Sequence, residues 1–100
     1  MLDVNIEFSR GVLFVRLSGS ITKDNINNIK YNIKSILEKS GIKFLVFNLS
    51  ELNMLDDISL FDECNSVIIK NKGKMIICGN DSLNYLSAKN ELSALRMLTC

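Results

Sequence analysis

The fold is decided by two fully apolar runs, Phe44-Leu45-Val46-Phe47 and Met75-Ile76-Ile77-Cys78, which flank residues 52–61. A strand that is apolar at every position is buried on both faces, which is typical of a parallel strand inside an α/β sheet. Between the runs, Asp56-Asp57-Ile58-Ser59 introduces a helix. Because loops at the carboxyl ends of parallel strands tend to carry function, this acidic helix start is the first candidate site.

The residues before these runs predict an antiparallel β-hairpin. Val4, Ile6 and Phe8 alternate with polar residues, which is the two-residue period of a half-exposed strand. The apolar segment 12–17 predicts the second strand, and Ser9-Arg10-Gly11 predicts the turn between the two.

Two long helices are predicted between the strands. The first is expected to run from an N-cap at Thr22 to about residue 39, with Gly41 as its C-cap. Its polar side, which includes Lys30 and Lys34, is interpreted as facing solvent. The second is expected from about residue 57 to 71. Apolar residues at three- and four-residue steps mark the buried side of the first helix: Ile26, Ile29, Ile33, Ile36 and Leu37.

Three segments have weaker patterns. Residues 48–55 are expected to form a loop, and Asn80-Asp81-Ser82 is expected to cap a short helix that contains Leu83, Tyr85 and Leu86. Residues 92–99 fit either a final strand or a final helix.

Together these elements predict one α/β domain over residues 1–100, with an N-terminal β-hairpin followed by βαβαβ. The sheet would be mixed and have four or five strands. Right-handed crossovers would place the helices mainly on one face of it.

The composition narrows the function. The net charge is +1 and the lysines are spread along the chain, so there is no basic footprint for nucleic acid. The chain has no histidine, which removes the commonest general base and the commonest metal ligand. Cys64, Cys78 and Cys100 lack the paired spacing of a zinc site. We therefore expect no catalytic residue, no metal site and no cofactor.

The same features suggest a location. The first residues do not resemble a signal peptide, and no apolar run approaches the roughly 18 residues of a membrane span. Unpaired cysteines favour a reducing compartment. The sequence thus predicts a soluble, cytoplasmic protein that does not insert into a membrane.

Three segments, taken in order, carry a family resemblance. They are Leu17-Ser18-Gly19-Ser20-Ile21, residues 47–56, and residues 72–79 with their glycine before an apolar strand. In this order and spacing they resemble the STAS domain, the module of bacterial anti-sigma factor antagonists. The resemblance covers about residues 4–88 and implies a STAS-like fold.

The resemblance also implies a phosphorylation motif that is degenerate here. In phosphoregulated members an aspartate precedes two hydroxyl residues and a glycine at a helix start. Asp56 matches the aspartate, but Asp57 and Ile58 stand at the hydroxyl positions and Ser59 falls on the glycine. Thr22 stands at another position that is acidic in the family. Ser59 is a candidate for a shifted phosphorylation site. Asp57 either mimics a phosphorylated state in part or only caps the helix. The family's last helix is expected to be truncated or absent.

The leading prediction is a non-catalytic protein-interaction module that acts in signalling and transcription regulation. Its partner would be an anti-sigma factor or a related kinase-like protein, and a homodimer is left open. Ile58 or Leu60 would anchor the partner, although Ile58 fits packing inward equally well. The predicted partner-binding residues lie in the turn after the second strand, the helix start and a later loop: Ser20, Thr22, Asp56, Asp57, Ile58, Ser59, Leu60 and Asn80.

Two alternatives are kept. A STAS-type structural subunit of a transporter or of a stressosome-like assembly, with an ABC-type transport ATPase as partner in the transporter case, would need no phosphorylation. A cation-binding or hydrolytic site would use Asp56, Ser59 and Glu63, which lie roughly on one helix face at three- and four-residue spacing. No base of suitable pKa accompanies them, so the enzymatic alternative is the weakest.

Overall fold

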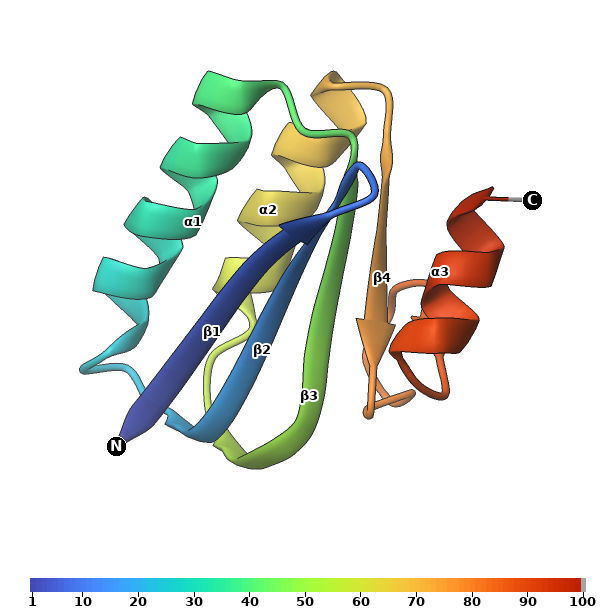
Figure 1. Cartoon of the computed structure of the whole chain (residues 1–100). Helices are drawn as coiled ribbons and strands as arrows, with labels where there is room; N and C mark the ends of the chain where they lie inside the picture. The colour runs from blue at the N-terminus through green and yellow to red at the C-terminus, as the bar shows by residue number, and fades with distance from the viewer. Residues whose placement is uncertain (100) are drawn as a thin grey trace.

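The computed structural model describes residues 1–99 as a sheet with helices on both faces (Figure 1). Its elements follow in the order β1 (Leu2–Ser9), β2 (Val12–Ile21), α1 (Ile26–Ser40), β3 (Phe44–Leu55), α2 (Ser59–Lys70), β4 (Lys74–Cys78), β5 (Ser87–Ala88) and α3 (Glu91–Thr99).

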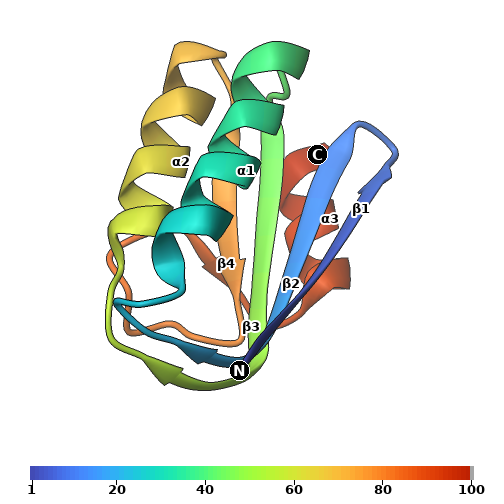
Figure 2. The ribbon, with the colours of Figure 1, turned by 90° about the vertical axis from the view of Figure 1, so that its left-hand side faces the viewer.

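The five strands lie in sequence order, β1-β2-β3-β4-β5. Strand β1 is antiparallel to β2, and each later pair is parallel. The β2–α1–β3 and β3–α2–β4 crossovers have the same handedness, so α1 and α2 lie together on one face of the sheet. Helix α3 covers the other face (Figure 2). The predicted α/β class, hairpin and βαβαβ order are confirmed.

The two apolar runs explain why both faces of the sheet are covered. Alternate residues of β3, Leu45 and Phe47, belong to the large core beneath α1 and α2. Val46, between them, belongs to a smaller core on the opposite face with Ile76 of β4 and Ala94 of α3. A solid apolar strand in the middle of the sheet therefore serves two cores at once.

Strand β3 is longer than expected, so the loop predicted over residues 48–55 is wrong. Its last residues pair only with β2, because β4 ends where Cys78 pairs with Asn48. Register shifts near Gly19 bend this part of the pair, and Ile21 still aligns with Leu55. Polar residues such as Glu51 and Asn53 are exposed here, which gave the segment its loop-like sequence.

The short helix expected at residues 83–86 is also wrong. The Asn80 side chain accepts hydrogen bonds from the Ser82 N–H and hydroxyl, at 3.0 and 2.6 Å, and this local turn replaces a helix cap. The chain then returns to the sheet, where the Ile77 N–H donates to the Leu86 carbonyl at 2.8 Å. Strand β5 that follows is two residues long.

Both long helices begin later than predicted. Helix α1 starts at Ile26, and its N-cap is Asn25 rather than Thr22. The Asn25 side chain accepts a hydrogen bond from the Thr22 N–H and donates one to the Ser20 carbonyl, both at 3.0 Å, so it holds the turn after β2. Helix α2 starts at Ser59 rather than near residue 57. The predicted Gly41 C-cap is confirmed, with φ of 62°.

Residues 92–99, left open between strand and helix, lie in helix α3, which is nine residues long. The chain therefore has a helix after its last strand, where a truncated or absent one was expected. An ionic cluster joins it to the sheet. Arg16 donates to both Glu91 carboxylate oxygens at 2.7 and 2.8 Å, and Asn48 donates to Glu91 at 2.8 Å. Arg16 also donates to Asn5 and Glu7 at 2.8 Å.

Within residues 1–99, none of the helices is both long and apolar enough to cross a lipid bilayer.

This cluster makes the stability of the fold dependent on pH. Hydrogen bonds from Arg16, and then from Asn48, hold the pKa of Glu91 below its ordinary value of 4.5. A carboxyl whose folded pKa is lowered stabilises the fold above its ordinary pKa and loses that contribution as the pH falls. We expect Glu91→Gln to cost about 1 kcal/mol at neutral pH and progressively less as the pH falls below the ordinary value of 4.5. Thermal unfolding of both proteins from pH 7 to 3 measures this. A difference in stability between the two proteins that does not change with pH would exclude the Glu91 charge as its cause.

Candidate functional site

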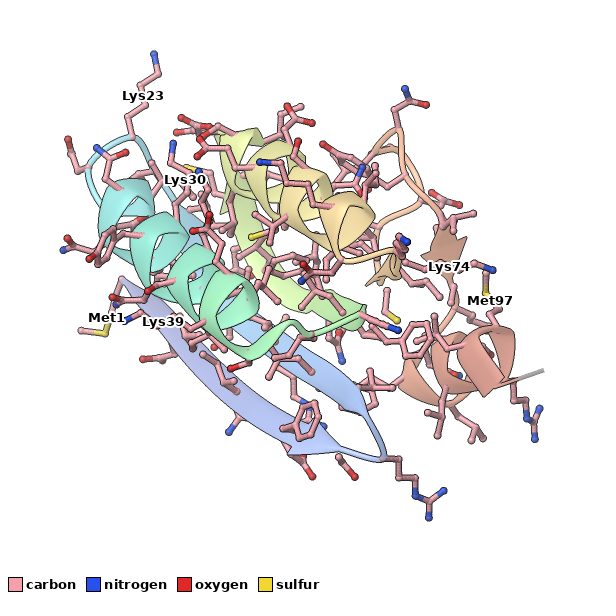
Figure 3. All side chains as sticks on the ribbon, turned by 90° about the horizontal axis from the view of Figure 1, so that it is seen from above. Met1, Lys23, Lys30, Lys39, Lys74 and Met97 are labelled. Atoms are coloured by element: carbon pink, nitrogen blue, oxygen red, sulfur yellow. The ribbon has the colours of Figure 1, made fainter. Side chains whose placement is uncertain are left out.

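The start of α2 holds a compact polar cluster around Ser59. The Ser59 N–H donates to the Asp57 carboxylate at 2.8 Å. The Lys30 ammonium, from α1, donates to the Ser59 hydroxyl at 3.0 Å. Lys30 extends from α1 between the two helices (Figure 3). Ser59 is therefore held between the carboxylate of Asp57, just before the helix, and a cation from the neighbouring helix.

Asp57 keeps its negative charge to a lower pH than a free aspartate does. Hydrogen bonds from the Ser59 side chain and then from its backbone lower the pKa of this carboxyl, with smaller contributions from Lys30 and Lys23. Its bond to the Ser59 N–H satisfies one of the free donors at the helix N-terminus. Negative charge is also favoured there by the helix dipole.

Glu63 connects this cluster to α1. Its carboxylate lies 3.1 Å from the Lys30 ammonium and 3.4 Å from that of Lys34. Lys30, by hydrogen bonding, is the largest cause of the lowered pKa of Glu63. Because Glu63 is neutralised by two lysines, it is poorly suited to bind a cation with Asp56 and Ser59. Asp56 also precedes the helix, so the three residues do not share the helix face that the spacing predicted.

The apolar residues at the helix start divide into an exposed one and a buried one. The Ile58 side chain is 45% exposed, whereas Leu60 is fully buried in the core beneath the helices. Leu60 therefore cannot anchor a partner on the surface, and the prediction that it could is wrong. Met54, near the end of β3, is also exposed, at 49%.

The other predicted site residues lie at the same end of the sheet, in two groups. Ser20 and Thr22 adjoin the helix start, because the Asp56 N–H donates to the carbonyl of Ile21 at 3.0 Å. Asn80 lies on the other side of β3, where it lines a shallow cleft with Leu55 and Asn53. The structure thus brings the first turn directly to the helix start and leaves the Asn80 loop across the strand.

Two residues of this region were missed by sequence reasoning. Asn25 holds the turn after β2, and Lys30 reaches Ser59 across the helix pair. The spacing of 29 residues between Lys30 and Ser59 gives no local signal. The sequence predicted that Lys30 lies on the solvent-facing side of α1. Only the packing of α1 against α2 shows that it meets Ser59.

Residues 1–99 offer little for nucleophilic or metal chemistry. They contain no group of three or more metal-donor side chains. The thiols of Cys64 and Cys78 are buried, and burial raises their pKa values to about 12 and about 11. A thiol with so high a pKa is a poor nucleophile at neutral pH.

Comparison with solved structures finds the same fold in several proteins described as anti-sigma factor antagonists. The unphosphorylated form of the anti-sigma factor antagonist SpoIIAA has a TM-score of 0.80 at 14% identity, covering 95% of this chain and 96% of that one. An antagonist from Mycobacterium paratuberculosis has a TM-score of 0.81 at 14% identity, covering 98% and 94%. A Thermotoga maritima protein described as a candidate antagonist reaches 0.85 at 10% identity, covering 95% and 93%.

These identities are too low to show more than a shared fold. The sequence itself matches the family model of the STAS domain over residues 3–82, which is well over half of the chain. The matched part extends from β1 to the loop after β4 and includes the whole cluster around Ser59. The chain therefore belongs to the STAS domain family.

Proposed function

We propose that this chain is a non-catalytic interaction module of the anti-sigma factor antagonist type. It binds a regulatory protein with the turn after β2 and the start of α2. The observation that carries the proposal is the 45% exposure of Ile58, at a helix start whose neighbouring residues are polar. An exposed aliphatic side chain with charged and polar neighbours has the composition of a small interface centre and its rim.

The arrangement of the neighbours supports this surface. Asp56 is exposed, and Asp57 and Ser59 are partly exposed on either side of Ile58. Ser20 and Thr22 adjoin them through the bond between Asp56 and Ile21, and Asn80 extends the surface across β3. The hydrogen bonds between Asp57 and Ser59 and between Asp56 and Ile21 hold the loop before α2 in one conformation, which lowers the entropic cost of binding.

The module binds without phosphorylation at the usual family position, where Ile58 has no hydroxyl. Asp57 supplies one permanent negative charge beside that position, as an incomplete mimic of phosphate or only as a helix cap. Ser59 is the remaining hydroxyl, and phosphate there would meet the Lys30 ammonium that now holds it. Two buried, unpaired thiols suit the reducing cytosol, in which we place the complex.

The test is binding to an anti-sigma factor kinase that co-purifies with the chain from its own cells. We expect Ile58→Asp to weaken this complex at least about tenfold, a loss of roughly 1.4 kcal/mol, because a charge replaces the apolar anchor. Isothermal titration calorimetry measures it. Ile69→Asp, at a residue of α2 that is 63% exposed, is the matched control and should bind like the wild type. Equal affinities of the two variants for the partner would show that Ile58 is not part of the interface.

The absence of a hydroxyl at Ile58 also favours a second candidate, a structural subunit of a transporter or of a stressosome-like assembly. In that case the purified partners would be assembly subunits or a transport ATPase, and the complex would not respond to ATP. Mass spectrometry of Ser59 after incubation with ATP and the partner separates the two roles. Phosphate on Ser59 would support the regulatory module, and an unmodified Ser59 in a stable complex would support the structural subunit.

A further inference from the structure

Strand β1 presents an open edge. It pairs with β2 alone, and within residues 1–99 no other strand lies beside it. The hairpin closes at Ser9 and Val12, and the Met1 carbonyl accepts from the Ser20 N–H at 3.1 Å. Because antiparallel pairs alternate, the odd-numbered residues of β1 bond to β2, and the even-numbered ones turn their N–H and C=O groups outward.

The outward-bonding residues also carry exposed apolar side chains. Val4, Ile6 and Phe8 are 38%, 42% and 62% exposed. Their β2 partners, Leu17, Val15 and Leu13, belong to the core beneath α1 and α2. The three apolar side chains of β1 therefore lie on the face of the sheet that α1 and α2 cover. The β1–β2 hairpin stands clear of α1 at its tip (Figure 2).

The edge lacks several of the features that usually prevent strand addition. Residues 2–9 contain no lysine and no proline, and the register between β1 and β2 is continuous, without a bulge. Eight residues of regular strand are long enough to accept a full partner strand.

Strand length and charge together select one register for pairing with an identical strand. An axis at Val4 or Phe8 would pair fewer residues of β1 than an axis at Ile6, and the charges on the other face of β1 decide among the rest. With Ile6 opposite Ile6 of a second copy, Asn5 faces Glu7 and Asp3 faces Ser9. Moving the axis to Asn5 sets Asp3 against Glu7, and moving it to Glu7 sets that residue against itself. Like charges directly opposite each other destabilise a strand pair. A register shifted by one residue would place apolar side chains against polar ones.

We propose that the β1 edge binds a second copy of this chain in antiparallel orientation, with Ile6 on the two-fold axis. One sheet then runs through both copies, and the rows Val4, Ile6 and Phe8 of the two chains lie side by side on the same face. Val4 of one copy contacts Phe8 of the other, and the outward N–H and C=O groups pair. The inference is independent of the function proposed above, since it uses neither the α2 start nor any partner protein.

Sedimentation equilibrium of the full chain, at concentrations up to about 1 mM, tests the association. We expect a concentration-dependent dimer for the wild type and a monomer for Ile6→Lys, which sets two ammonium groups together on the axis. Ile69→Lys, at an exposed isoleucine of α2, is the matched control and should remain dimeric. Circular dichroism checks that each variant is folded. A monomeric wild type, or equal loss of dimer in both variants, would overturn the proposal.

Disulfide crosslinking tests the register. Directly opposite residues in a hydrogen-bonded pair have Cα atoms about 5.5 Å apart, within the range of a disulfide. In a Cys100→Ser background, Ile6→Cys should form a covalent dimer on mild oxidation. Val4→Cys should not, because its copies lie four residues apart along the strand, roughly 13 Å. Cys64 and Cys78 are buried and do not compete. Crosslinking at position 4 that equals or exceeds that at position 6 would overturn this register.

Discussion

Replacing Phe61 by alanine is expected to lower the free energy of unfolding by about 3–5 kcal/mol, the largest single effect we predict. Phe61 is fully buried between α2 and the sheet. Its ring meets Phe47 of β3 edge to face, with centroids 4.9 Å apart, and lies 6.5 Å from the ring of Tyr85. Truncation removes these contacts and leaves a cavity that the parallel strands cannot close, because their own side chains fill both cores.

Urea denaturation monitored by circular dichroism measures the loss. Ile69→Ala, also in α2 but 63% exposed, is the matched control and should cost no more than about 0.5 kcal/mol. A similar loss in both variants would mean that burial of the Phe61 ring is not the source of its contribution, because alanine itself favours the helix.

Gly73→Ala is expected to cost about 3 kcal/mol, near the upper end for overpacking. A Cβ atom at Gly73 would lie 1.6 Å from the carbonyl oxygen of Lys43 and 2.6 Å from its Cα atom. Both are backbone atoms, so no side chain can rotate out of the way. Relief requires the turn after α2 to move away from β3, which would break the 2.8 Å hydrogen bond from the Lys74 N–H to the Lys43 carbonyl.

Gly41→Ala separates this steric cost from the cost of backbone conformation. Gly41 has φ of +62° but no atom within 4 Å of an added Cβ. Its substitution should therefore cost only the left-handed conformation, about 1–2 kcal/mol. Chemical denaturation of the two variants under one set of conditions gives the comparison. If Gly41→Ala were the more destabilising, the close approach of Gly73 to Lys43 would not control the stability of this turn.

Local periodicity was enough to predict the hairpin, both long helices and the parallel strands. Each of these elements has a strong apolar pattern, and all but β1 bury the side that the pattern marks. In β1, the apolar residues Val4, Ile6 and Phe8 stay exposed. The prediction was wrong where pairing across the sheet overrides local sequence. The end of β3 looks like a loop because only β2 pairs with it, and residues 83–86 look like a helix start because Asn80 makes a local turn. The first outcome depends on a strand distant in the chain, and the second depends on the return of the chain to β4, where the Ile77 N–H donates to Leu86.

The candidate site was predictable to the same extent. The sequence located the acidic start of α2, since Asp57 and Ser59 interact within three residues of chain. It did not identify Lys30, which joins the cluster only when α1 packs beside α2. It also could not decide between Ile58 and Leu60 as the exposed residue. Leu60 shares the buried face of α2 with Cys64 and Val67, whereas Ile58 precedes the first turn of the helix and is exposed.

The short strand β5 limits how far copies of this chain can associate through their sheets. Growth into a filament needs two usable edges on every copy, so that each newly added molecule offers a site for the next. Here the opposite edge is divided into two short pieces. Strand β5 adds Ser87 and Ala88 beside Ile77 and Cys78, and within residues 1–99 only the first three residues of β4 have no strand beside them on this side. The chain then leaves the sheet to form α3. An edge this short gives an incoming strand few hydrogen bonds. Pairing at β1 uses up the one long edge of each molecule, so assembly ends at two copies and concentrated solutions should stay free of fibrils.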